Sequence, residues 1–171
     1  MTKPLLLRYT LHRSHLDLPF VSMLRKGKEY RMTPADIARL VEDWAIAWSS
    51  SHAQEKLTSL FTDDCVYEDL AMGITVHGKA ELAQLYTTAR NAFPDYKVEV
   101  TAHVVADDRG GAEWVMSGTH TGDLPGLPAT NKYASVRAAS IFELRGDKVS
   151  RWSDYFDMVT VLKQVGAMPS N

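Results

Sequence analysis

Residues 151–166 read RWSDYFDMVTVLKQVG and place an aspartate between bulky aromatic residues on a predicted strand. Side chains alternate between the two faces of a strand, so Trp152, Asp154 and Phe156 share one face. The two large aromatic side chains predict that this face points into the protein. Asp157 falls on the opposite face at the end of the strand, where it is suited to cap a closing helix.

Asp154 therefore has two interpretations. Burial against Trp152 and Phe156 would raise the pKa of the carboxyl group toward the working range of a general acid or base. Alternatively, Asp154 is a structural carboxylate that is paired with a buried donor, such as Arg137 or a tyrosine. The alternation pattern alone leaves both interpretations open.

The two-residue period extends upstream of this stretch. Alternating apolar and polar segments are separated by the turn-forming sequences DDRGG, GDLPGLPATN and RGD. The pattern predicts strands over residues 96–106, 112–121, 132–144 and 148–157.

The first half of the chain is mainly helical in pattern. Thr33 is suited to an N-cap and Pro34 to the first helical position, and apolar residues follow at steps of three and four. Further helices are expected over residues 54–61 and 77–93, with a short strand, DDCVYEDL, between them. Three helices followed by an antiparallel run predict an α+β fold in which the helices cover one face of a curved, mainly antiparallel sheet.

The predicted sheet leaves room for a ligand if its small inward residues, Gly118, Ala138 and Ser140, lie on the concave face. A mostly apolar cavity with a few polar groups is the usual design of a small-molecule site, although a filled core gives the same pattern. The expected walls of a substrate pocket are Trp114, Met116, Trp152 and Phe156.

Three further polar residues are candidates for this pocket. Tyr67 and Asp69 alternate on the short strand and so share a face, where they could supply a phenol and a second carboxylate; Asp69 could equally be a turn residue. His120, in the segment GTHTG, could orient a substrate oxygen or share proton transfer with Asp154. A loop histidine bonded to nearby backbone is the alternative. We therefore group Tyr67 and His120 with Asp154 as candidate catalytic residues, and Asp69 with the pocket walls.

Composition narrows the function classes. The net charge of −2 gives no electrostatic reason to expect nucleic acid or an acidic membrane as a partner, and no apolar run approaches the length of a bilayer span. The single cysteine, Cys65, cannot form an internal disulfide and is expected in the core. Histidine spacings do not suggest a metal site, and no phosphate-binding loop or dinucleotide fingerprint is present. We expect a cytoplasmic protein without a cofactor.

Residues 1–31 differ in composition from the rest and are predominantly basic among their charged residues. They are interpreted as a loosely attached N-terminal extension, with a targeting peptide or a true start at Met32 as alternatives. Residues 32–171 are predicted to form a single domain.

Four segments together resemble the SnoaL-like polyketide cyclases, which belong to the superfamily with the cone-shaped nuclear transport factor two fold. They are HGKAEL, FPDYKVEV, SGTHTGDLPGLPAT and RWSDYFDMVTVLKQVG, within residues 33–166. The resemblance implies intramolecular aldol ring closure without metal or organic cofactor, with Asp154 at the position of the acid/base carboxylate. It also implies a homodimer formed through the convex face of the sheet, which the outward residues Tyr133, Val149 and Tyr155 would suit.

The C-terminal stretch is also similar to that of limonene epoxide hydrolase, whose tyrosine and asparagine after the second helix fall on Tyr67 and Asp69. However, Trp114 and Met116 occupy the positions of that enzyme's arginine and second aspartate, so its epoxide-opening relay is absent. We therefore predict acid/base-catalysed cyclisation or isomerisation of a hydrophobic small molecule. A hydrolase or dehydratase with an activated water, and a non-catalytic binding or dimerisation domain, are the alternatives.

Overall fold

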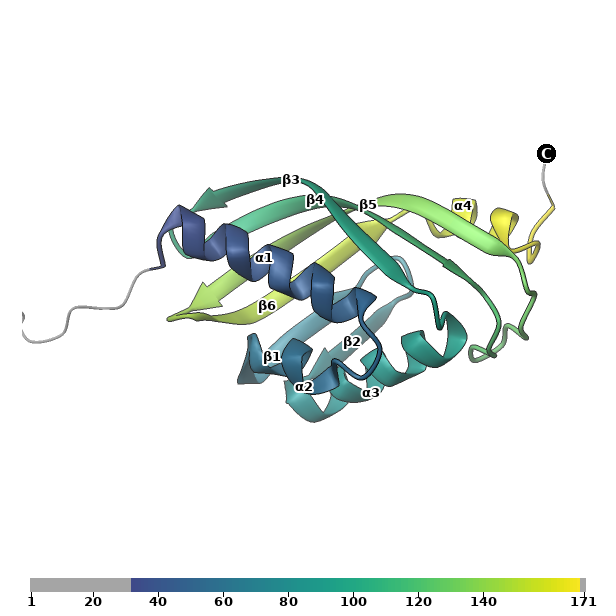
Figure 1. Ribbon diagram of the computed structural model, residues 1–171, viewed down its shortest axis with the longest axis horizontal. Helices are drawn as coiled ribbons and strands as arrows, with labels where there is room; N and C mark the ends of the chain where they lie inside the picture. The colour runs from purple at the N-terminus through teal and green to yellow at the C-terminus, as the bar shows by residue number, and fades with distance from the viewer. Residues whose placement is uncertain (1–31, 170–171) are drawn as a thin grey trace, which may run out of the picture.

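The computed structural model describes residues 32–169, in which helices pack against a strongly curved sheet (Figure 1). The predicted basic extension lies outside the described residues. The elements are α1 (Pro34–Ser49), α2 (Gln54–Ser59), β1 (Phe61–Asp69), β2 (Ile74–His77), α3 (Gly78–Ala92), β3 (Lys97–Ala106), β4 (Arg109–Thr119), β5 (Tyr133–Arg145), β6 (Lys148–Phe156) and α4 (Met158–Gln164).

In this part of the chain the sheet has six strands in the order β2-β1-β6-β5-β4-β3. All neighbouring strands are antiparallel except β1 and β6, which run parallel. The predicted α+β architecture with a mainly antiparallel sheet is therefore correct, but the short strand β2 was not predicted. The parallel register aligns Tyr67 with Trp152 and Asp69 with Asp154, so the C-terminal ends of β1 and β6 bring their polar residues side by side.

The helices cover the concave face of the sheet, with α1 crossing β3 and α3 lying against β1 (Figure 1). Helix α1 begins with a capping box, in which Thr33 and Asp36 bond to each other's backbone N–H groups. Its buried face carries two tryptophans one turn apart, Trp44 and Trp48, which reach into the interior of the cone. No helix among the described residues is long and apolar enough to cross a membrane.

A group of stacked aromatic residues fills the narrow part of the cone. Trp152 is fully buried and stacks on Trp44, with ring centroids 4.4 Å apart, and on Phe142, at 5.0 Å. Trp114 meets Trp44 edge to face at 5.2 Å. Such dense aromatic packing forms a core around Trp152, and Trp44 and Trp114 extend from this core to the wall of the cavity described below.

One face assignment on β6 is wrong. Val149 was expected on the outer face with Tyr155, but it is fully buried. The register between β5 and β6 shifts between Glu143 and Leu144, which pair with Arg151 and Val149. This irregularity leaves Ser150 without a Cα partner on β5, and it reverses the alternation so that both Val149 and Trp152 point inward.

Candidate active site

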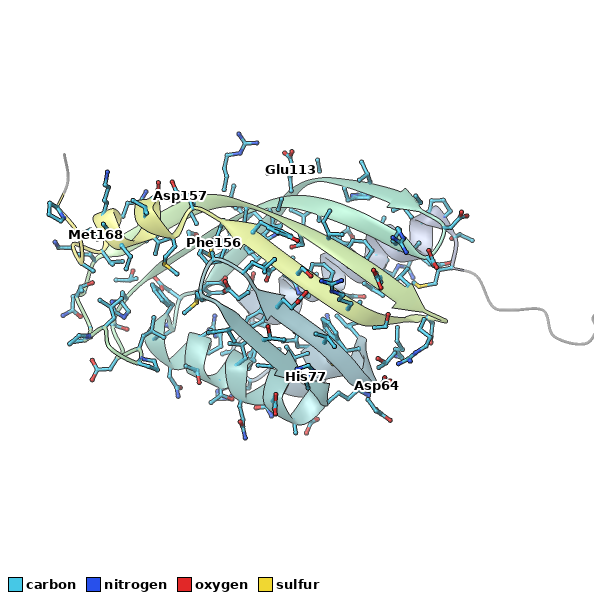
Figure 2. All side chains as sticks on the ribbon, turned by 180° about the vertical axis from the view of Figure 1, so that it is seen from behind. Asp64, His77, Glu113, Phe156, Asp157 and Met168 are labelled. Carbon is cyan, nitrogen blue, oxygen red and sulfur yellow. The ribbon has the colours of Figure 1, made fainter. Side chains whose placement is uncertain are left out.

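The wide end of the cone holds a cavity of 880 Å³, near the upper limit of about 1,000 Å³ for small-molecule pockets. Side chains from α1, α3, β1, β4, β5 and β6 form its walls, and α4 and residues 124–127 contribute further lining. In Figure 2, Phe156 and Asp157 mark the end of β6 where α4 begins, with Met168 beyond α4. The cavity therefore lies where the predicted strand ends and the closing helix starts.

Asp154 lines this cavity, although only 4% of its surface is exposed. Its Oδ1 atom accepts hydrogen bonds from Ser140 Oγ and Trp152 Nε1, both at 2.6 Å. Its Oδ2 atom accepts a hydrogen bond from the Tyr67 hydroxyl. Ser140 Oγ in turn accepts from Trp114 Nε1 at 2.8 Å, so an indole orients the hydroxyl that holds the carboxylate. Asp154 is thus held in one orientation by donors from β1, β5 and β6.

None of these donors carries a charge. Arg137, one of the partners considered from the sequence, is exposed and lies 3.3 Å from Glu113. The tyrosine alternative is correct, since Tyr67 is the partner. Burial without a compensating cation raises the pKa of Asp154 to about 7, although the three hydrogen bonds oppose the shift. A carboxyl group with this pKa exchanges its proton readily at neutral pH.

Asp69 is a second carboxylate on the cavity wall, in register with Asp154 on the adjacent strand. Its Oδ1 atom accepts a hydrogen bond from Met72 N at 2.8 Å, which fixes the turn after β1. Burial raises the pKa of Asp69 to about 6, and its charge adds to the upward shift at Asp154. Asp69 therefore combines both roles considered from the sequence, because it lies at a turn and also faces the cavity.

Six of the eight predicted site residues line the same cavity: Tyr67, Asp69, Trp114, Met116, Asp154 and Phe156. Trp152 does not form a wall, because it lies deeper, in the aromatic core. It acts on the site through its Nε1 hydrogen bond to Asp154. The expected substrate contact of Trp152 is therefore replaced by a supporting contact.

His120 lies outside both the cavity lining and the hydrogen-bond network of Asp154. Its buried ring stacks on Phe93 at 5.1 Å, and its Nδ1 atom is 3.2 Å from Thr130 Oγ1. Its backbone oxygen accepts from Thr130 N and Asn131 N and anchors the returning loop. The geometry favours the loop-histidine alternative over a catalytic role.

We expect His120→Phe to keep the catalytic rate within about threefold of the wild-type rate. Phenylalanine can maintain the stack on Phe93, and it removes the Nε2 atom, which has no hydrogen-bond partner in the described structure. A general acid or base would instead contribute about 10²–10⁴-fold. The exchange assay described below measures the rate, and a hundredfold loss in a folded variant would restore the catalytic interpretation.

Several residues of the site were not predicted. Tyr96 and Trp48 line the cavity, as do the loop residues Leu124 and Leu127. Tyr96 opens the predicted strand over residues 96–106, where alternation puts it on the same face as the buried Val98 but does not separate a cavity wall from a filled core. The cavity-facing side of α1 likewise has the same apolar pattern as its core-facing side. Within residues 32–169, no group of three or more acidic, histidine or cysteine side chains is placed to hold a metal ion.

Solved structures define the class of protein by its fold. A protein from Catenulispora acidiphila with a ketosteroid isomerase-like fold, solved in complex with trimethylamine, is 26% identical; the match covers 81% of this chain and 96% of that one, with a TM-score of 0.69. A candidate SnoaL-like polyketide cyclase from Jannaschia is 16% identical over 81% and 98% of the two chains, with a TM-score of 0.72. A candidate polyketide cyclase from Streptomyces antibioticus, IdmH, is 20% identical over 75% and 97%, with a TM-score of 0.65. The predicted cone-shaped fold is thereby confirmed.

The chain belongs to the SnoaL-like polyketide cyclase family, whose model matches residues 23–165. This agrees with the resemblance of its sequence motifs. A search of curated proteins finds no match. The similarity to limonene epoxide hydrolase is not supported by these comparisons. Membership of this family suggests an enzyme of the cofactor-free cyclase or isomerase type.

Proposed function

We propose that the protein is a cofactor-independent enzyme that removes a proton from carbon next to a carbonyl group, and that Asp154 is the base. The observation that carries the proposal is the environment of Asp154: a buried carboxylate at the wall of a large apolar cavity, held by neutral donors and with its pKa raised to about 7. The alternative is that Asp154 is a structural carboxylate whose only role is to pair with its neighbours in the fold.

In the proposed reaction the Asp154 carboxylate takes a proton from the α-carbon of a ketone. The electron pair of the broken C–H bond moves to the carbonyl oxygen and forms an enolate. In ring closure the enolate carbon then bonds to a second carbonyl carbon of the same molecule, and the resulting alkoxide takes the proton back from Asp154. In isomerisation the proton returns to a different carbon. The apolar walls fold the substrate into a reactive geometry.

The electrostatics of the cavity favour a substrate without negative charge. Among the described lining residues, Asp69 and Asp154 are the acidic side chains and no lysine, arginine or histidine is present. An anionic ligand would be repelled by both carboxylates in a low-dielectric setting. We therefore propose a neutral, hydrophobic substrate rather than one that carries a carboxylate or phosphate group into the cavity.

Deuterium exchange on a simple ketone tests the proposal without knowledge of the natural substrate. 2-Tetralone is neutral, bicyclic and carries acidic α-protons. In D₂O the protein should accelerate the loss of the α-proton NMR signals above the buffer rate, and Asp154→Asn should remove the acceleration. If the wild-type protein accelerates exchange neither for 2-tetralone nor for analogous ketones of other ring sizes, the result would favour the non-catalytic alternative.

The adjacent carboxylate of Asp69 supports a second candidate function, the activation of a water molecule in a hydrolase or dehydratase. Two neighbouring carboxyl groups with pKa values of about 6 and 7 can divide the roles of acid and base. The two reaction classes differ in the fate of solvent oxygen. A hydrolase incorporates ¹⁸O from labelled water into its product, whereas a cyclase or isomerase leaves the product oxygen unlabelled once background carbonyl exchange is subtracted.

We also propose a homodimer formed through the outer face of the sheet. Tyr133, Ile141 and Tyr155 are 59%, 55% and 47% exposed on β5 and β6. Ile141 takes the place of the buried Val149 in the predicted apolar surface. Tyr155→Glu should shift the protein toward a monomer in light scattering at matched concentration, and a wild-type monomer at high concentration would contradict the proposal.

A further inference from the structure

Tyr96 is held in a fixed position at the cavity wall. Its ring lies edge-on to Trp48, at 6.0 Å, and to Phe93, at 6.3 Å. Its backbone N–H donates to Phe93 O at 3.0 Å, and its carbonyl accepts from Arg90 Nη1 at 2.9 Å. The aromatic contacts and the backbone bonds together preorganise the phenol before a ligand binds.

The hydroxyl group of Tyr96 has a weak acceptor. It donates to Met116 Sδ at 3.3 Å, and a thioether sulfur is a poor hydrogen-bond acceptor. Met116 also lines the cavity, so this bond lies at the wall and not in the packed core. An oxygen atom of a ligand would be a much better acceptor, and the cost of leaving the sulfur is small.

The other phenol of the cavity, that of Tyr67, already has a strong hydrogen-bond acceptor. Tyr67 donates its proton to Asp154, and an ionised or partly ionised carboxylate is a strong acceptor that a ketone oxygen does not displace. Tyr67, a candidate catalytic residue from the sequence, therefore acts as a hydrogen-bond donor to the base. The reacting oxygen still needs a donor, because negative charge develops on it during proton removal.

The two carboxylates of the cavity act on the pKa of Tyr96. Burial is the main cause that raises its pKa, and the charges of Asp154 and Asp69 raise it further. A phenol with a raised pKa stays protonated throughout the working pH range. Tyr96 therefore offers a proton for hydrogen bonding and does not give it up.

We propose that Tyr96 donates a hydrogen bond to the carbonyl oxygen of the substrate, exchanging Met116 Sδ for that oxygen, and stabilises the enolate that Asp154 generates. The inference rests on the proposed function, and it names the group that binds the carbonyl oxygen of the substrate. No proton leaves Tyr96 in this step. The C–H proton goes to Asp154, and the electron pair goes to the oxygen that Tyr96 contacts.

A series of substituted 2-naphthols with graded acidity tests this hydrogen bond without turnover. Their ionised oxygen mimics the charged enolate oxygen, and the series is measured in an Asp154→Asn background, because the neutral amide reproduces the protonated base that faces the enolate; calorimetry at pH 7.5 gives the dissociation constants. With Tyr96 intact in this background we expect affinity to rise with naphthol acidity. Adding Tyr96→Phe should flatten this dependence, and Tyr96→Phe alone should lower the 2-tetralone exchange rate, by about 10²-fold if the loss resembles that of other oxyanion donors.

Tyr86→Phe is a matched control. Tyr86 is more deeply buried than Tyr96, lies outside the cavity lining and bonds to the backbone at Ser50 and Ala53. Its loss should lower the thermal midpoint while leaving the naphthol dependence intact. Met116→Leu gives an independent test, because removal of the sulfur frees the Tyr96 hydroxyl and should tighten naphthol binding.

The outcomes separate this inference from the proposed function. A folded Tyr96→Phe variant with an unchanged naphthol dependence and a wild-type exchange rate would overturn the role of Tyr96, even if Asp154→Asn is inactive. Unchanged or weaker naphthol binding by Met116→Leu would also count against it. Conversely, a flattened dependence in Tyr96→Phe, together with full exchange activity in Asp154→Asn, would retain the oxygen site and refute Asp154 as the base.

Discussion

Asp154→Asn is expected to reduce the rate of 2-tetralone deuterium exchange by about 10³-fold, within the range of about 10²–10⁴ for loss of a general base. The amide has no basic lone pair at neutral pH, whereas the carboxylate it replaces has a pKa of about 7. Substrate binding should change little, because the two side chains have nearly the same shape. The loss should therefore fall on kcat more than on KM.

The variant is expected to fold because its surroundings can accept an amide. The asparagine oxygen can take the hydrogen bonds of Ser140 Oγ and Trp152 Nε1. Its NH₂ group then faces Tyr67, whose hydroxyl can rotate and accept in place of donating. No buried polar atom is left without a partner by this exchange, so loss of activity would not reflect unfolding.

Removing the charge should also change how stability depends on pH. The folded-state pKa of Asp154 is about 7, above its ordinary value of 3.8, so the folded protein binds more protons than the unfolded chain between these limits. The contribution of Asp154 to the free energy of unfolding therefore falls as the pH rises from about 4 to 7. Relative to the wild type, Asp154→Asn should become progressively more stable over the same interval in urea titrations.

Asp157→Asn is the matched control for this variant. Asp157 lies three residues further along and is exposed, and it caps α4 by accepting from Thr160 N at 3.1 Å. Asparagine is as good an N-cap as aspartate, so neither fold nor cavity should change. Its exchange rate should match that of the wild type, and an equal loss in both variants would show that the assay reports stability rather than base catalysis.

Trp152→Ala should cost about 3–5 kcal/mol of folding free energy, the range for truncating a large buried aromatic side chain. Trp152 is fully buried, and its ring lies against Trp44, Phe142 and Phe61. Removing it opens a cavity at the centre of the aromatic core. Since single domains have about 5–15 kcal/mol of stability, this loss should bring the variant close to unfolding, as measured by its urea midpoint.

Trp152→Phe separates the packing role from the hydrogen bond. Phenylalanine retains stacking partners but removes Nε1, which donates to Asp154 Oδ1 at 2.6 Å. This hydrogen bond stabilises the ionised carboxylate of Asp154, so its loss should raise the pKa of Asp154 above the wild-type value. The inflection of the exchange rate should therefore move to higher pH. An unchanged inflection in this variant would show that Trp152 does not tune the base, and a small stability loss in Trp152→Ala would contradict its place in the core.

The alternation in RWSDYFDMVTVLKQVG was sufficient to predict the inward direction of Asp154 and the cap at Asp157. Strand alternation is a local property, and it holds where the register is regular. The prediction from alternation failed at Val149, because the irregular pairing near Glu143 reverses the two faces of the strand. No residue type in the sequence indicates that register shift. Trp152 was predicted on the correct face. Alternation gives the face of a residue but does not say whether an inward side chain lies in the packed core or at the cavity wall.

The partners of Asp154 could be predicted only in part. A tyrosine was among the expected donors, but Ser140 and its indole support from Trp114 depend on the pairing of β4, β5 and β6. Histidine is a common catalytic residue type, yet the ring of His120 stacks on Phe93 and is not among the side chains that line the cavity. These outcomes depend on register and tertiary contact, which a single sequence does not specify.

The pH dependence of 2-tetralone exchange tests the central claim most directly. Because Asp154 must be ionised to accept a proton, the wild-type rate should rise with pH through an inflection near 7 and then level off, after subtraction of the hydroxide-catalysed background. The same profile for Asp154→Asn should contain background only. A wild-type rate that is flat from about pH 5 to 9, or an inflection near 7 that persists in Asp154→Asn, would contradict the assignment of Asp154 as the catalytic base.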